Sequence, residues 1–214
     1  MGIGDLSVGG SVKLKGPIKL GNLSIAGSLS VEGDLEADVL EVSGSGRVAG
    51  RLKSGRITVS GSLLVEKNIE GGQIEVSGSL SVSETVEAEN LSISGSLKAG
   101  EVRAGRLEIR GVAKGGIFKG REVEVGRESE VHGVVVGCTV VVARNASVDK
   151  VVGKQVRVGR GAMVDYLEAE EVVVEDLADI GVLTYVVKAE LSSKARIGET
   201  RKTDKLSITP DCNV

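Results

Sequence analysis

The chain has 214 residues, of which 41% are hydrophobic and only three, Phe118, Tyr166 and Tyr185, are aromatic. Its formal net charge of −3 argues against nucleic acid as the main partner, because that role favours a net positive surface. With 31 glycines and few aromatic side chains, the composition indicates a narrow aliphatic core and not the core of a conventional globular domain.

The first residues, MGIGDLSVGG, contain no basic end followed by an apolar stretch, so we expect no secretory signal. No segment approaches the roughly 18 uninterrupted apolar residues of a membrane-spanning helix. We therefore expect a cytoplasmic protein without a transmembrane segment, and we interpret residues 1–4 as a short N-terminal lead.

From residue 5 onward, apolar pairs recur with one polar residue between their members, as expected of strands with one buried face. The unit NLSIAGSLSVEGDLEAD carries three such pairs, separated by small and polar residues that suit tight corners. Units of this kind repeat about every 16–17 residues along the chain. The first pair of each unit begins at Leu6, Leu23, Leu40, Ile57, Ile74, Leu91, Leu107, Val123, Val140, Val156 and Val172.

Three strands per unit predict a triangular β-solenoid whose successive coils stack through parallel backbone pairing. The fold class is therefore all-β, a single-stranded parallel β-helix of about 11–12 coils, because each repeat can bury its apolar face only against its neighbours. The period runs without a linker, so we expect one β-helix over residues 5–198, followed by a C-terminal tail over residues 199–214.

The motifs that could carry chemistry each have a simpler explanation in the repeat. The stretch GSGRVAG at 44–50 is similar to a dinucleotide-binding loop, but no helix follows it and Gly46 occupies the repeat position of Leu29. The single histidine, His132, lies at a predicted corner without a serine or cysteine nucleophile placed beside it. We expect no catalytic residue, no cofactor and no metal site, and therefore no enzyme.

The two cysteines, Cys138 and Cys212, match no metal-ligand spacing. We expect both to be free thiols; a disulfide between the tail and the β-helix is the alternative.

The two ends of a solenoid expose unpaired strand edges, which invite another subunit. The first coil has a complete apolar set with no amphipathic helix to cover it. The tail either caps the β-helix or completes a neighbour's coil, and we favour the second because Pro210 stops further pairing nearby. The candidate polymerisation interface comprises Leu6, Val8, Val12, Leu14, Ile18 and Leu20 at one end and Ala195, Ile197, Leu206 and Ile208 at the other, where the last two residues could begin a final strand.

Outward positions that are polar in the early coils, such as Glu36 and Lys53, become apolar in the later ones. Such a stripe indicates a lateral partner or a folded-back tail, and scattered surface valines are the alternative. The candidate lateral contact comprises Val136, Val141, Val152 and Val173.

Charged residues occur in blocks of one sign, acidic over 32–41, basic over 47–56 and acidic again over 165–179. Ion pairs between adjacent coils on a solvated surface are the simple explanation. The alternative is that bands of opposite charge set the lateral register of neighbouring molecules.

The chain resembles bactofilins, a family of polymer-forming cytoskeletal proteins, in the units GSLSVEGDLEAD, GSLLVEKNIEGGQIEVSGSLSVSETVEAENLSISGSLKAGEVRAG and GRESEVHGVVVG. The resemblance covers roughly residues 5–198. It implies a right-handed triangular β-helix that polymerises end to end into filaments without bound nucleotide. The chain departs from the family in its nearly doubled number of coils and in lacking a membrane-binding N-terminal tail, so membrane attachment is not implied.

Two other classes of β-solenoid provide alternatives. Hexapeptide acyltransferases place a small residue two positions before the aliphatic one, whereas Leu35-Glu-Ala37 and Leu167-Glu-Ala169 have the reverse order. Glycine-rich β-helix domains that serve as subunits of larger enzymes or as division-inhibitor dimers would make this chain a protein-binding module. Our main expectation is a structural filament-forming protein whose partners are itself and other scaffold or cell-envelope proteins.

Overall fold

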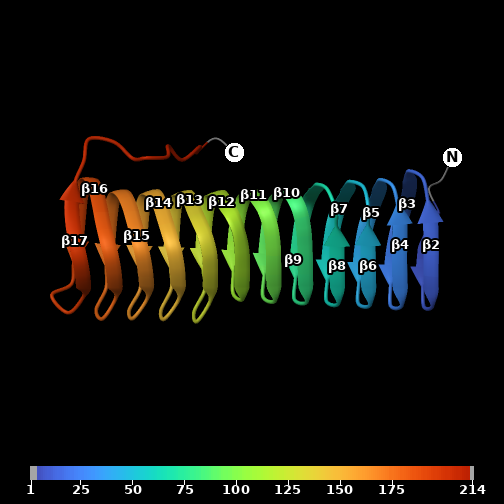
Figure 1. The fold of residues 1–214 in the computed structure, drawn as a ribbon, viewed down its shortest axis with the longest axis horizontal. Coiled ribbons are helices and arrows are strands. Elements are labelled where there is room, and N and C mark those ends of the chain that lie inside the picture. Colours follow the sequence, from blue (N-terminus) through green and yellow to red (C-terminus); the bar gives the residue numbers. More distant parts are fainter. Residues whose placement is uncertain (1–3, 213–214) are drawn as a thin grey trace. The chain divides into compact units, whose positions relative to one another are not determined.

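The computed structural model describes residues 4–212, which form 17 β-strands and no helix. The strands are parallel and stack as a β-solenoid of about 12 turns, which confirms the predicted all-β parallel β-helix. The chain groups into two compact units, Met1–Arg103 and Ala104–Val214. Figure 1 shows the strands of each unit. The right-handedness implied by the resemblance stays a prediction.

The described part of the first unit contains ten complete strands and the beginning of an eleventh. They are β1 (Leu6–Val8), β2 (Ser11–Lys15), β3 (Ile18–Ile25), β4 (Ser28–Glu32), β5 (Leu35–Val42), β6 (Ser45–Val48), β7 (Leu52–Val59), β8 (Ser62–Val65), β9 (Ile69–Val76), β10 (Ser79–Ile93) and β11 (Ser96–Ile109).

Strand register in the first unit follows the sequence repeat. Leu23 pairs with Leu40, and Leu40 pairs with Ile57, so one turn of the solenoid corresponds to one repeat unit. Along β5, buried and exposed side chains alternate except at Asp38 and Val39, where two successive residues are not buried and the strand turns a corner. This pattern places the core inside the coil and the charged side chains outside it.

The described part of the second unit contains the end of β11 and six further strands. They are β12 (Val112–Val125), β13 (Glu130–Val142), β14 (Ser147–Val158), β15 (Met163–Val174), β16 (Asp179–Leu191) and β17 (Arg196–Lys202). Val140 pairs with Val156, which pairs with Val172, so these turns are one residue shorter than the turns that begin at Leu23 and Leu40.

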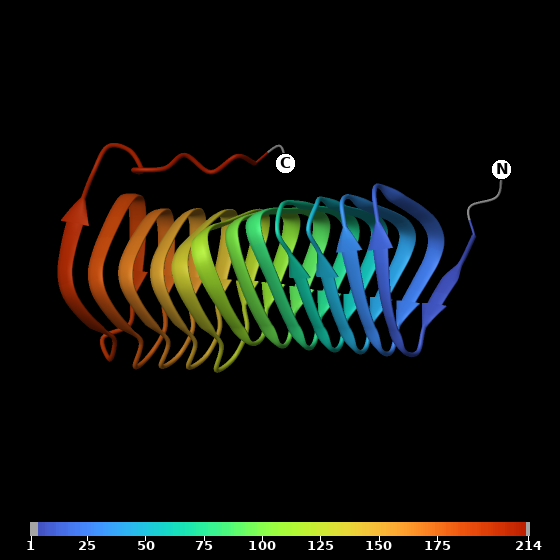
Figure 2. The same ribbon diagram turned by 45° about the vertical axis from the view of Figure 1, so that its right-hand side comes forward.

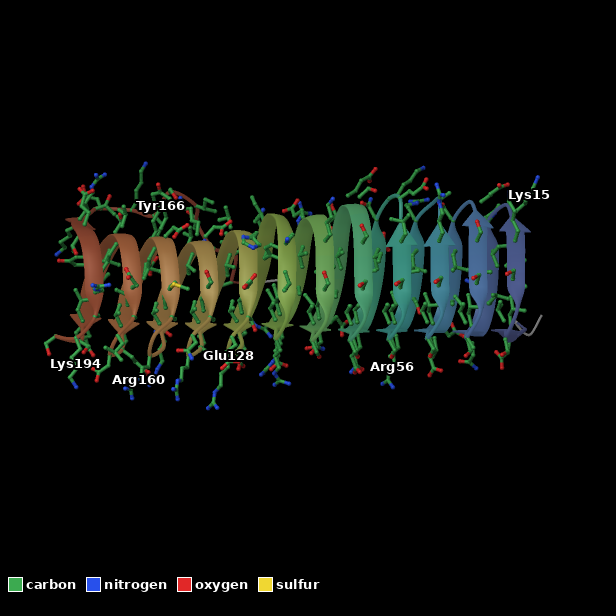
Figure 3. All side chains as sticks on the ribbon, turned by 60° about the horizontal axis from the view of Figure 1, so that its bottom comes forward. Lys15, Arg56, Glu128, Arg160, Tyr166 and Lys194 are labelled. Carbon is green, nitrogen blue, oxygen red and sulfur yellow. A yellow bond between two sulfur atoms is a disulfide. The ribbon has the colours of Figure 1, made fainter. Side chains whose placement is uncertain are left out.

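Four of the corners that join the strands of the second unit have a residue in the left-handed region of backbone conformation. Backbone φ is +57° at Glu128, +58° at Asn145 and +60° at Leu177, and Gly161 has +69°. Glu128, Arg160 and Lys194 lie along this edge of the unit, with their side chains directed away from the core (Figure 3). The turn residues therefore project from the stack, whereas Ala146, Ala162 and Ala178, which follow them in the loops, are buried in the core.

After β17 the chain leaves the stack. Residues 203–212, here called the return segment, form no strand and run back alongside the turns of the second unit (Figure 2). The segment begins with a hydrogen bond from the Thr203 N–H to the Tyr185 carbonyl, at 3.0 Å. Leu206 and Ile208 lie half-buried in this segment. Because the segment contains no strand, the expectation that they begin a final strand is wrong.

Candidate assembly surfaces

The N-terminal edge of the first unit brings together all six apolar residues predicted there. Among the described residues, β1 pairs only with β3, and β2 pairs only with β4. The next turn buries the equivalent side chains, such as Leu23 and Leu29. In this first turn Val8 is buried, but five side chains stay half-buried: Leu6, Val12, Leu14, Ile18 and Leu20.

The C-terminal edge of the second unit is more polar. Ala195 and Ile197 are half-buried, as an open edge would leave them. However, Thr200 and Lys202 pair with Leu183 and Tyr185 and therefore continue core columns with polar side chains. Polar residues at these positions make this edge less favourable for burial than the N-terminal one.

Two apolar residues at the C-terminal edge were missed in the sequence. Val187 is 59% exposed and Leu191 is 40% exposed. The pairing of β16 with β15 is irregular between Ala169 and Glu171, and this bulge displaces the strand that carries Val187. The irregular apolar spacing near residue 187 was the only signal in the sequence that marked this site.

The structure separates Leu206 and Ile208 from the C-terminal edge with which they were grouped. They belong to the return segment, which lies along the side of the second unit. The predicted C-terminal interface is therefore reduced to Ala195 and Ile197 at the edge itself.

The four valines of the predicted lateral contact occupy two different faces. Val136 and Val152 are register neighbours on the outward face of β13 and β14, yet they are only 3% and 0% exposed. Val141 and Val173 lie in another column, where Arg157 separates them. Val141 is half-buried and Val173 is 40% exposed.

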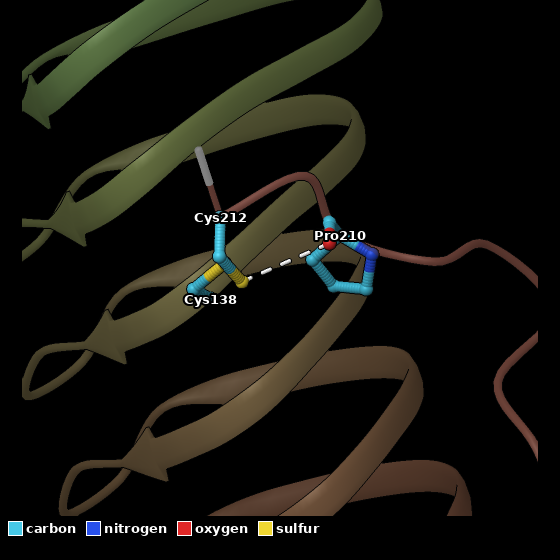
Figure 4. The surroundings of a disulfide bond; sticks show 3 residues. All are labelled: Cys138, Pro210 and Cys212. Carbon is cyan, nitrogen blue, oxygen red and sulfur yellow. Dashed lines mark hydrogen bonds between the residues drawn. A yellow bond between two sulfur atoms is a disulfide. The ribbon is translucent and has the colours of Figure 1, made fainter. Parts of the chain in front are cut away.

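A disulfide fixes the end of the return segment. Cys138 and Cys212 are bonded, with their Cα atoms 5.7 Å apart, and Pro210 lies beside them (Figure 4). The expectation of free thiols is therefore wrong, and the alternative of a tail-to-helix disulfide is confirmed. Because disulfides persist mainly in oxidising compartments, the cytoplasmic location stays a prediction.

A polar cluster holds the middle of the return segment, and no pattern in the sequence groups its members. The Ser207 N–H donates to Glu168 Oε2 at 2.9 Å, and Lys150 Nζ lies 2.7 Å from Glu168 Oε1. Partial burial disfavours ionisation of Glu168, but the hydrogen bonds from Lys150 and Ser207 outweigh it and lower the pKa of this carboxyl. Glu168 is thus held as a carboxylate by Lys150 of the solenoid together with Ser207 of the return segment.

Charges on the early coils pair between adjacent turns. Lys19 Nζ lies 2.5 Å from Glu36 Oε1, and Lys53 Nζ lies 3.0 Å from Glu70 Oε2. The four residues occupy one register column with alternating sign. These pairs support the simple explanation of the charge blocks.

Within residues 4–212, no group of three or more His, Cys, Asp or Glu side chains could hold a metal ion. His132 Nδ1 lies 3.4 Å from Asp149 Oδ1, on an exposed part of the surface. No helix in the described range is long and apolar enough to cross a membrane.

Gly46 pairs with Leu29, as the repeat predicted, and a Cβ on Gly46 would approach Leu63 Cδ1 to 2.9 Å. The glycine in the GSGRVAG stretch therefore makes room for a core leucine of the following turn. This geometry explains the glycine without a nucleotide.

Comparison with protein-family models, with curated proteins and with solved structures found no match. The resemblance to bactofilins therefore rests on the repeat units alone.

Proposed function

We propose that this protein is a structural scaffold of the bactofilin type, whose copies join end to end through the open edges of the solenoid without bound nucleotide. The observation that carries the proposal is the N-terminal edge, where unpaired strands and half-buried aliphatic side chains occur together. The solenoid fold itself suits a structural role, because each turn pairs with the next through parallel strands and an end turn can pair with another copy in the same way.

The energetic argument rests on what a second copy would bury. Complete burial of a large aliphatic side chain contributes about 1.5–3 kcal/mol, and each of these side chains has part of that still to gain. Five of them together contribute on the order of 5 kcal/mol before the entropic cost of association. Backbone hydrogen bonds along β1 and β2 would also fix the orientation of the second copy.

The C-terminal edge supplies a weaker surface. Ala195 and Ile197 are available there, and Val187 and Leu191 add exposed apolar area. Thr200 and Lys202 oppose deep burial. The N-terminal edge is therefore the one at which a substitution should affect assembly most.

A paired-variant experiment tests the proposal. Leu6→Glu with Val12→Lys places charges on the half-buried positions of β1 and β2. The control, Ser7→Glu with Ser11→Lys, places the same charges on exposed positions of the same strands. We expect the wild type and the control to sediment as polymers, and the edge variant to stay in the supernatant with an unchanged β-sheet circular dichroism spectrum. Equal sedimentation of all three proteins would overturn the proposal.

A protein-binding module is the second candidate, and β15 is the observation that favours it. Three large apolar side chains on this strand are exposed: Met163 at 52%, Tyr166 at 57% and Val173 at 40%. Such residues suit a partner surface. A monomeric wild-type protein in the sedimentation experiment would favour this candidate over the scaffold.

A further inference from the structure

One covalent bond and several hydrogen bonds fasten the return segment to the solenoid. Of residues 203–212, only Pro210 is buried, and none belongs to a strand. Its hydrogen bonds to the solenoid include those of Thr203 and Ser207. A segment with so little buried surface has a low local stability, so the Cys138–Cys212 bond is its principal anchor.

The surface beneath the segment is apolar. Val136 and Val152 point outward from β13 and β14, and both are buried although neither faces the core. Val135 and Val151, their chain neighbours, occupy the inward positions. Ser207 binds Glu168, which is the register neighbour of Val152, and Cys212 is bonded to Cys138, two residues after Val136. Departure of the return segment, which runs back along this unit (Figure 2), would therefore leave the two outward valines open to solvent.

We propose that the return segment is an exchangeable latch, which thiol reduction releases so that the same segment of a second copy takes its place and joins two copies side by side. The return segment of a second copy is the expected partner, because the outward side of β13, β14 and β15 already binds residues 203–212 of its own chain. The segment of another copy would make the same contacts with Val136, Val152, Glu168 and Cys138, in the manner of a domain swap.

The length of the segment permits the exchange. About ten residues in an extended conformation reach roughly 33 Å, enough to leave one molecule and lie on the face of a neighbour. Whether the latch closes within one chain or between chains then depends on the local concentration of the neighbouring face. This lateral contact uses no residue of the N-terminal edge and does not depend on end-to-end assembly.

Breaking and re-forming the disulfide are each two-electron steps. A dithiol reductant attacks one sulfur of the Cys138–Cys212 bond and forms its own cyclic disulfide, which leaves two protein thiols. A small-molecule disulfide then accepts two electrons as Cys212 of one copy bonds to Cys138 of the other, and two small thiols are released for each bond formed. The reciprocal bond closes a symmetric dimer without free thiols.

Isotope mixing distinguishes exchange from closure within one chain. Equal amounts of unlabelled and 15N-labelled protein are reduced with dithiothreitol, freed of it, and oxidised with a small-molecule disulfide at low and at high protein concentration. Trypsin, which cuts after Arg127, Arg144 and Lys205, then releases the two cysteine peptides as a linked pair for mass spectrometry. The Leu6→Glu, Val12→Lys protein is used throughout, so that end-to-end contacts play no part.

We expect mixed-isotope pairs to be near zero at low concentration and to approach half of all pairs at high concentration, in closed dimers without free thiols. Same-isotope pairs alone at both concentrations would overturn the proposal. An open-ended series of covalent oligomers with free thiols would also overturn it, because random oxidation produces that pattern.

Substitutions on the outward surface that carries Val136, Val152 and Glu168 show whether this surface selects the return segment of a second copy. Val152→Asp should lower the yield of closed dimers at least five-fold, whereas Val141→Asp, on the other column, should leave it unchanged. If Val152→Asp disturbs folding, Ser207→Pro is the second variant, since it removes the N–H that binds Glu168 and lies outside the solenoid. An unchanged yield in Ser207→Pro and in any folded Val152→Asp protein would show that the face does not direct the pairing.

Discussion

Gly61 lies against the backbone of Gly44, so closely that a Cβ on Gly61 would be 2.0 Å from the carbonyl oxygen of Gly44. Real Cβ atoms essentially never approach another atom below 3.0 Å. The stacking distance between turns therefore demands glycine at this corner. The same relationship recurs at the equivalent corners of Gly27, Gly44, Gly78 and Gly95.

Gly61→Ala should lower the free energy of unfolding by about 3 kcal/mol, because the added methyl group forces adjacent turns apart. Gly10→Ala is the matched control, since Gly10 contributes the carbonyl that Gly27 faces, but nothing lies within 4 Å of its own Cβ position. Urea denaturation followed by circular dichroism measures both. Equal free energies of unfolding for the two variants would show that adjacent turns move apart at this corner without loss of stability.

Phe118 is the only aromatic side chain buried among the described residues, with 0% exposure. Phe118→Ala should cost about 3–5 kcal/mol, because the narrow core cannot collapse around the cavity. Tyr166→Ala removes an aromatic ring that is 57% exposed, and it should change stability by less than about 0.5 kcal/mol. The same denaturation measurement checks both values. An unchanged free energy of unfolding in Phe118→Ala would contradict the close packing described for the core.

Once Cys212→Ser removes the covalent anchor, the return segment should exchange between bound and released states, and acid should shift this equilibrium toward release. Lys150 and Ser207 both lower the pKa of Glu168, and because the Ser207 hydrogen bonds are lost on release, the free segment leaves a carboxyl that binds protons more readily. The contact with Glu168 therefore favours the bound state most above about pH 4.5, and its contribution is lost as the pH falls through the lower pKa of that state.

The Ser207 amide resonance in a 15N NMR titration reports this detachment. We expect it to move toward its random-coil position as the pH falls from 6 to 3. The matched Glu168→Gln protein should show little pH dependence over that range. A Ser207 resonance that stays fixed down to pH 3 in the Cys212→Ser protein would contradict the role assigned to Glu168.

The disulfide makes a direct prediction about thiols. Protein purified without reductant should take up no alkylating reagent in denaturant, and reduced protein should take up two equivalents, at Cys138 and Cys212. Intact mass spectrometry distinguishes the two results. Two labelled cysteines before reduction would mean that the bond does not form in solution.

The repeat made the stack of turns predictable. A strand period of two and a nearly constant turn length are local signals that reinforce one another over many units, so even Gly46 could be assigned to the column of Leu29. The first turn was predictable for the same reason, because its apolar residues follow the same alternation.

The features outside the repeat were not predictable from periodicity. The direction of the chain after Lys202 depends on tertiary contacts, so the sequence could not pair Cys212 with Cys138 or choose what covers Val136 and Val152. The left-handed corner at Leu177 also lacks a sequence signal, because a leucine rarely adopts that conformation.

Electron microscopy of negatively stained wild-type protein at micromolar concentration, with no nucleotide added, tests the scaffold proposal most directly. The open N-terminal edge predicts long thin fibres, formed by copies that continue one another's turns. Discrete particles of uniform size under these conditions would contradict end-to-end assembly and would direct attention to the exposed side chains of β15 as a partner surface.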